Sequence, residues 1–236
     1  MDYLYDMIKD IKDNNGAEYV DTPLDFFYKD KASFVKKIHL CADELSSCVE
    51  KKDLEGCIVN LLSELYYILD RFVEQGINPG ILLSLIINDK SNKLWPDGEE
   101  HFDSHCRTIY PPNYKDISDE IDYQILSMKE KCYEKNNNTV SKYYNDILEY
   151  LKKTKAKCKD EPRCLKEKEV ESYQYRLSSC LTDYLNCVFV EEEAEFLSEV
   201  LFETMKTFVL MGVNPEKLIE EFIEKERKES LKRKSK

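Results

Sequence analysis

The chain has 236 residues, and its 47 acidic side chains outnumber 35 basic ones, giving a formal net charge of −12. This acidity argues against a nucleic-acid partner, because phosphate contacts need a basic face. Hydrophobic residues make up 42% of the chain, yet no apolar run is long enough to span a membrane, so we expect a cytoplasmic protein without a membrane partner.

Apolar residues in the first part of the chain recur with the period of a helix. Glycine and proline are few, which favours long helices over many turns, and Asp53 is well placed as an N-cap. The expected helices cover residues 2–13, 31–51, 54–75 and 79–89.

The last two of these helices are joined by Gly76-Ile77-Asn78-Pro79. Glycine just past a helix can adopt the left-handed conformation that satisfies the last carbonyls. Asparagine is a strong N-cap, and proline suits the first helical position because the N–H it lacks would have no partner there. The short connection predicts that the two helices lie side by side.

Residues 90–117 depart from the helical pattern, with turn signals at both ends of the segment. A loop of this length is usually functional or flexible. The segment contains His101 and, four residues later, His105 followed directly by Cys106. These three side chains suggest a zinc site, but a fourth ligand at a standard spacing is missing.

The second half repeats a cassette of the first. Leu45-Ser46-Ser47-Cys48 and Gly76-Ile77-Asn78-Pro79 return as Leu177-Ser178-Ser179-Cys180 and Gly212-Val213-Asn214-Pro215. This recurrence predicts a duplicated helical unit. Further helices are expected over residues 118–135, 163–187, 190–211 and 215–230, and a short helix is expected to open with residues 144–148.

Two other groups of residues have a simple structural interpretation. The nine cysteines are interpreted as reduced thiols that act as small apolar residues, although Cys158 and Cys164 flank a turn and are the one candidate disulfide pair. The acidic run over residues 191–193 is interpreted as favourable charge at a helix start, with metal binding as the alternative.

Several short motifs, taken in order, resemble the MazG-like, all-α nucleoside triphosphate pyrophosphohydrolases, especially the Cof-like phosphoribosyl-ATP pyrophosphohydrolase branch. The resemblance covers about residues 1–117. The motifs are Asp21-Thr22-Pro23, Asp43-Glu44, Asp53, Gly76-Ile77-Asn78, Lys93-Leu94-Trp95-Pro96-Asp97-Gly98 and Tyr110-Pro111-Pro112.

The resemblance implies an all-α fold of two MazG-like helical units packed as an intramolecular pseudo-dimer. The first unit covers residues 1–117 with a nucleotide loop over 90–117, a connecting helix covers 118–138, and the second, divergent unit covers 139–236. The protein would be a monomeric pseudo-dimer or a homodimer.

The family's chemistry implies four carboxylates on two adjacent helices that hold Mg²⁺ against the substrate phosphates. Here the four positions fall on Glu44, Ser47, Asn60 and Ser63, so three of them hold neutral side chains. A rearranged metal site could use Asp43, Glu44 and Glu64 instead. Asp70 is a further candidate for this site, and the alternative is that Glu64 and Asp70 face solvent or pair with Lys and Arg residues on neighbouring helices.

The resemblance also implies a nucleotide site in the loop. Lys93 and Arg107 are the candidates for phosphate contacts, and Trp95 and Tyr110 are candidates for stacking on a base. The alternatives are that the cations are solvated and that the aromatic residues anchor the loop on the helices.

Three functions are therefore kept. The first is a MazG-like protein with impaired or absent pyrophosphohydrolase activity that binds a nucleotide or a protein partner. The second is an active Mg²⁺-dependent pyrophosphohydrolase with relocated carboxylates, which converts a nucleoside triphosphate into a monophosphate and pyrophosphate. The third is a purely structural interaction protein.

Overall fold

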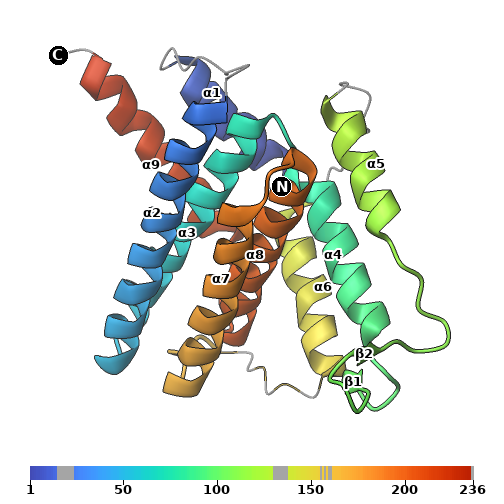
Figure 1. Ribbon diagram of the computed structural model, residues 1–236. Coiled ribbons are helices and arrows are strands. Elements are labelled where there is room, and N and C mark those ends of the chain that lie inside the picture. Colours follow the sequence, from blue (N-terminus) through green and yellow to red (C-terminus); the bar gives the residue numbers. More distant parts are fainter. Residues whose placement is uncertain (15–23, 130–137, 155, 157, 159–160, 235–236) are drawn as a thin grey trace.

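The computed structural model describes residues 1–14, 24–129, 138–154, 156, 158 and 161–234, and these residues form an all-α fold (Figure 1). A two-stranded antiparallel hairpin, β1 (His101–Phe102) and β2 (Thr108–Ile109), lies at one end. The helices are α1 (Asp2–Asn14), α2 (Leu24–Glu50), α3 (Leu54–Gln75), α4 (Pro79–Lys93), α5 (Ser118–Lys129), α6 (Val140–Lys153), α7 (Glu167–Asn186), α8 (Val190–Leu210) and α9 (Glu216–Lys234).

Four long helices form the centre of the molecule. Helix α2 packs on α3 and α7, and α8 packs on the same two helices. Their apolar faces meet in one core, in which a fully buried leucine or phenylalanine contributes about 1.5–3 kcal/mol. Fully buried members of this core include Ile38, Leu45, Leu61, Leu65, Leu177, Leu181, Leu201 and Phe208.

The outer helices connect the two halves of the chain crosswise. Helix α4 follows α3 in sequence but packs on α8 and α6, whereas α9 follows α8 but packs on α3 and α1. Tyr143 of α6 donates a hydrogen bond to the carbonyl of Gly80 at the start of α4, at 2.9 Å. The contacts of the two halves thus correspond in pairs. That the halves form a pseudo-dimer stays a prediction, as do the domain bounds.

The predicted caps at the helix junctions are confirmed, but the prediction that the joined helices lie side by side was wrong, because α4 packs on α8 and α6 instead of α3. Gly76 and Gly212 have φ values of 70° and 69°, in the left-handed region. The Asp53 carboxylate accepts the backbone N–H of Gly56, and the Asn78 side chain accepts that of Gly80, so both residues cap a helix start.

Several predicted helix bounds were wrong. Helix α2 begins at Leu24 instead of residue 31, α4 ends at Lys93 instead of residue 89, and α6 (Val140–Lys153) begins at residue 140 instead of 144. In α6 the extra turns are stabilised by Thr139, whose side chain caps the helix, and by burial of an apolar face. The Asp21-Thr22-Pro23 motif lies outside the described residues, and so does the end of the predicted connecting helix.

The segment that follows α4 has a defined structure. Trp95 donates its indole N–H to the carbonyl of Ile109 at 2.8 Å, which attaches the start of the segment to β2. Gly98 has a φ of 82° and lies so close to α6 that an added Cβ would stand 2.0 Å from the carbonyl oxygen of Lys153. The hairpin is therefore seated on the end of α6.

Within the described residues, no helix is both long and apolar enough to cross a membrane. The cysteines that the structure describes are free thiols, including Cys158 and Cys164, which the sequence suggested as a pair. Cys41, Cys57 and Cys187 are buried, in agreement with their interpretation as core residues.

Candidate functional site

The three neutral side chains at the family's metal positions bond to their own helices. Ser47 Oγ donates to the carbonyl of Asp43 at 3.3 Å, and Ser63 Oγ donates to that of Val59 at 3.0 Å. Asn60 Nδ2 donates to the carbonyl of Gly56 at 3.0 Å. Each acceptor lies four residues earlier in the chain, which is the local bonding common for such residues in helices.

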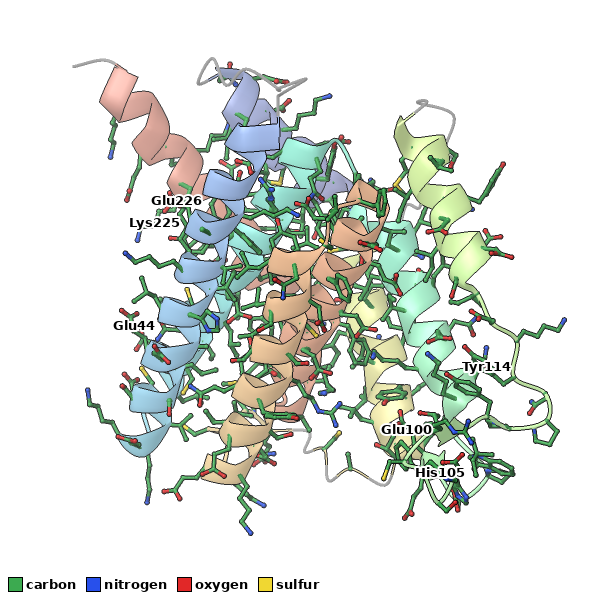
Figure 2. All side chains as sticks on the ribbon, in the orientation of Figure 1. Glu44, Glu100, His105, Tyr114, Lys225 and Glu226 are labelled. Atoms are coloured by element: carbon green, nitrogen blue, oxygen red, sulfur yellow. The ribbon has the colours of Figure 1, made fainter. Side chains whose placement is uncertain are left out.

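The structure does not bring the three predicted metal carboxylates together. Glu44 is exposed on α2 (Figure 2), and Glu64 is fully buried inside the bundle. Asp43 lines a groove of about 250 Å³ between α2 and α7, together with His39, Gln174 and Ser178. In the part of the chain that the structure describes, no group of three or more His, Cys, Asp or Glu residues is arranged to hold a metal ion.

Glu64 is surrounded by helices α3, α7 and α8. Its Oε1 atom accepts hydrogen bonds from the Tyr173 hydroxyl and from Thr204 Oγ1, the latter at 2.6 Å. Burial raises the pKa of Glu64 to about 7, and the two hydrogen bonds oppose this shift. The expectation that Glu64 faces solvent or pairs with a cation was therefore wrong, because it contacts two neutral hydroxyls.

The predicted nucleotide residues Lys93 and Tyr110 meet at the end of α4. Lys93 Nζ lies 2.5 Å from a carboxylate oxygen of Asp89, and the Tyr114 hydroxyl donates to the other oxygen at 3.0 Å. The rings of Tyr110 and Tyr114 stack with centroids 4.2 Å apart, and Lys93 Nζ lies 5.9 Å from the Tyr110 centroid. Burial would lower the pKa of Lys93, but the Asp89 carboxylate raises it above its usual value.

The other two predicted nucleotide residues lie in the hairpin. Trp95 stacks on the His101 ring at 4.9 Å, and Asp97 in turn hydrogen-bonds His101 Nε2 at 2.7 Å. Arg107 pairs with Asp103 through two nitrogens, each at 2.8 Å. Both residues therefore make their contacts within the hairpin, and Arg107 is at the same time exposed to solvent.

The two histidines considered for zinc point to different partners. His101 contacts Trp95 and Asp97, whereas His105 Nδ1 lies 3.1 Å from the hydroxyl of Ser104. Cys106 is exposed in a left-handed turn with a φ of 58°. These contacts give no support to a zinc site.

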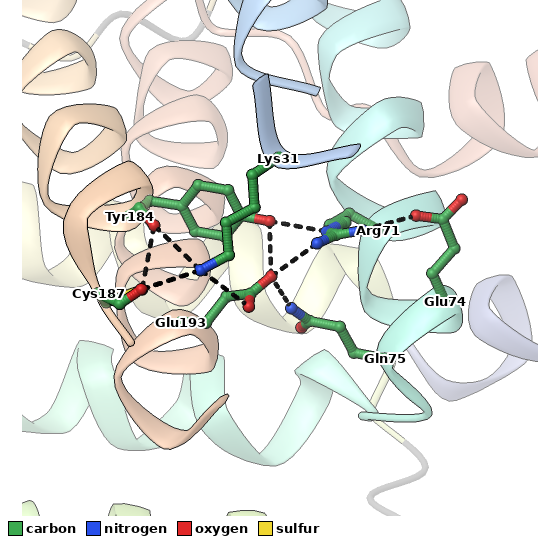
Figure 3. Close-up of polar contacts among 7 residues, drawn as sticks. All are labelled: Lys31, Arg71, Glu74, Gln75, Tyr184, Cys187 and Glu193. Carbon is green, nitrogen blue, oxygen red and sulfur yellow. Dashed lines mark hydrogen bonds and ion pairs between the residues drawn. The ribbon is translucent and has the colours of Figure 1, made fainter. Parts of the chain in front are cut away.

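A buried charged network, which the sequence did not suggest, connects α2, α3, α7 and α8 (Figure 3). Glu193 lies at its centre with a fully buried side chain, 2.9 Å from an Arg71 nitrogen and 3.2 Å from Lys31 Nζ. The Tyr184 hydroxyl accepts from Arg71 Nε and donates to Glu193, each at 2.7 Å. Gln75 donates to the same carboxylate.

This network gives one residue of the acidic run 191–193 a contact that its interpretation as charge at a helix start does not include. Glu193 does lie in the first turn of α8, but its carboxylate is buried between two cations from the other half of the chain. No local signal in the sequence distinguishes it from Glu192, which is exposed. The one available signal was the pair of basic residues Lys31 and Arg71 within otherwise apolar helical faces.

Charged residues of α7 and α8 in the second half are also paired. Glu199 of α8 pairs with Lys90 of α4 at 2.7 Å, and Arg176 of α7 lies 3.7 Å from Glu203. These pairs connect helices and leave no set of carboxylates facing one point.

Comparison with known proteins identifies no relative: no family model, no curated protein and no solved structure matches this chain. Its function must therefore be inferred from its own residues.

Proposed function

We propose that this protein is a binding protein with a MazG-like helical fold that lacks efficient pyrophosphohydrolase activity and contacts a protein partner through residues 94–117. The observation that carries the proposal is that Ser47, Asn60 and Ser63 bond to carbonyl groups of their own helices. Of the four positions that correspond to the family's metal ligands, only Glu44 is charged. A Mg²⁺ ion needs oxygen ligands that converge with enough negative charge to replace part of its water shell.

The hairpin supports the choice of a protein partner. Phe102 is 55% exposed, Ile109 is 41% exposed and Tyr110 is 46% exposed, all within one short segment. Loops that a rigid scaffold positions often carry binding residues, and these exposed apolar side chains are available to a partner. The cations that a nucleotide would need, Lys93 and Arg107, are already paired with carboxylates.

Replacing Phe102 and Ile109 together by serine is expected to reduce partner capture at least tenfold while preserving helical content. The measurement is affinity capture from the native source followed by binding of the recovered partner to purified protein. The matched control replaces Leu40 and Val59, which are 52% and 49% exposed on helices α2 and α3. Equal loss of capture in both double variants would contradict the hairpin as the contact region.

A nucleotide partner is the second candidate, favoured by the Tyr110–Tyr114 stack beside Lys93. A base could extend this stack, since base–aromatic stacking contributes about 1–3 kcal/mol. Isothermal titration with a panel of nucleotides, each with and without Mg²⁺, separates this candidate from the first. Binding that Tyr110→Ala abolishes would support it.

The active enzyme remains a defined alternative with its own test. If relocated carboxylates hold Mg²⁺, then Glu44→Gln abolishes the release of pyrophosphate from nucleoside triphosphates. We expect no robust Mg²⁺-dependent release from the native protein. Robust release would overturn the main proposal, and an unchanged rate in Glu44→Gln would exclude Glu44 as the metal ligand.

A further inference from the structure

Glu64 has a buried environment that differs from that of every other carboxylate discussed above. Its side chain is fully inaccessible, and its Oε2 atom is buried without a hydrogen-bond partner. A carboxylate ion in such a place loses its hydration, and only two neutral hydroxyls replace it. No cation is among the groups that shift its titration.

The hydrogen bonds around Glu64 have room for one more proton. Thr204 Oγ1 lies 2.6 Å from Glu64 Oε1 and 2.9 Å from the carbonyl oxygen of Val200. A threonine hydroxyl has a single hydrogen, so it cannot donate to both oxygens. If Glu64 is protonated on Oε1, it donates to Thr204, and Thr204 donates onward to Val200. The chain of three oxygens is then complete.

No cation of the described residues bonds to Glu64, whose partners are the hydroxyls of Tyr173 and Thr204. Tyr173 of α7 donates its hydroxyl, and Glu203 of α8 acts on Tyr173 as a further negative charge. Helix α2 contributes the Cys41 thiol. Burial raises the pKa of this thiol to about 12, and the nearby Glu64 and Glu44 carboxylates act in the same direction. Glu203 is itself paired with Arg176 of α7 and Lys206 of α8, and neither of these cations is among the groups that shift the pKa of Glu64.

We propose that Glu64 is a proton-binding site that locks α3 to the α7–α8 pair, and that its ionisation loosens this contact. Glu64 belongs to the first half of the chain, whereas Tyr173 and Thr204 belong to the second. The proton therefore strengthens the connection between the halves. Below neutral pH Glu64 is protonated and the contact between α3 and the α7–α8 pair is stable. Above neutral pH the buried negative charge of Glu64 opposes the packing of α3 on α8.

The sign of the effect on stability follows from proton binding. The folded protein binds a proton at Glu64 more tightly than the unfolded chain, because the pKa rises from 4.5 to about 7 on folding. Stability therefore falls as pH rises through the window from about 4.5 to about 7, and the loss is complete above it. Each unit of pKa difference changes the folding constant tenfold, so the total loss is roughly three hundredfold, of which about a hundredfold falls between pH 5 and pH 9.

The test compares the native protein with Glu64→Gln, whose amide is neutral and can donate to Thr204 as the protonated acid does. The folding constant is measured by urea denaturation from pH 5 to pH 9. We expect Glu64→Gln to lack the hundredfold decrease that the native protein shows. The matched control is Glu171→Gln on the exposed face of α7, which keeps the native pH profile.

A second measurement covers the case in which Glu64→Gln does not fold. Carbon NMR of the glutamate carboxyls in the native protein follows Glu64 directly, assigned by its proximity to Tyr173. A midpoint near neutral pH, with faster hydrogen exchange in α3 and α8 above it, supports the lock. A midpoint near 4, or equal pH slopes in the native protein and Glu64→Gln, overturns the proposal.

Discussion

Buried ionisable side chains dominate the chemistry of this protein at the scale of single residues. Glu64 and Glu193 are both fully buried, yet only Glu193 is paired with cations. The two glutamates could not be distinguished from the sequence, because the residues that decide their charge environment, Thr204 for Glu64 and Arg71 for Glu193, lie more than 100 residues away in the chain. A contact between residues so far apart in the chain produces no periodic pattern in the sequence from which it could be predicted.

Replacing Glu193 by glutamine is expected to destabilise the protein by about 3–5 kcal/mol, because Lys31 and Arg71 then remain buried without a counter-charge. The measurement is the free energy of unfolding in urea. Glu192→Gln is the control, since Glu192 is exposed one residue earlier in the same helix. A loss below about 1 kcal/mol for Glu193→Gln would show that the two cations reach solvent or find other partners.

At the scale of elements, local signals gave reliable junctions but less reliable helix bounds. Gly76, Asn78 and Asp53 act through atoms a few residues away, so their roles could be predicted from the sequence alone. The extension of α4 to Lys93 depends instead on ion pairs, one of them with Glu199 of a distant helix. The predicted helices were all present, whereas their ends depended on tertiary contacts.

Two glycines with positive φ give a prediction at this scale. An added methyl group at Gly76 meets no atom within 4 Å, whereas at Gly98 it would meet the Lys153 carbonyl at 2.0 Å. Gly76→Ala should therefore cost only the backbone strain of about 1–2 kcal/mol. Gly98→Ala should in addition displace the hairpin from α6.

The two variants are compared by urea denaturation and by limited proteolysis of residues 94–117. We expect faster cleavage of this segment in Gly98→Ala and native cleavage in Gly76→Ala. The same cleavage rate in both variants would mean that the hairpin does not depend on its contact with α6.

At the scale of the whole molecule, the crosswise packing of α4 and α9 connects the two halves. Each of these helices buries its apolar face on the half from which it does not come. The all-α class could be predicted from helical periodicity and from the repeated cassette. The partner of each helix could not, because periodicity shows which face is buried and does not show what covers it.

This arrangement predicts a single cooperative unfolding transition for the whole chain. The chain has one tryptophan, Trp95, so its fluorescence reports on the loop of the first half, while circular dichroism reports on all helices. The two signals should give the same urea midpoint. A separate, earlier transition in either signal would show that the halves unfold independently.

The crosswise helices also affect how one copy of the chain can meet another. A surface that holds α4 from its own chain would hold α4 from a second chain equally well, because the contacting atoms are identical. Two copies can therefore exchange halves and keep every contact between helices. In such an exchange the balance between one chain and two is set by protein concentration and by the connection between the halves, and a measured dimer would by itself reveal no additional interface.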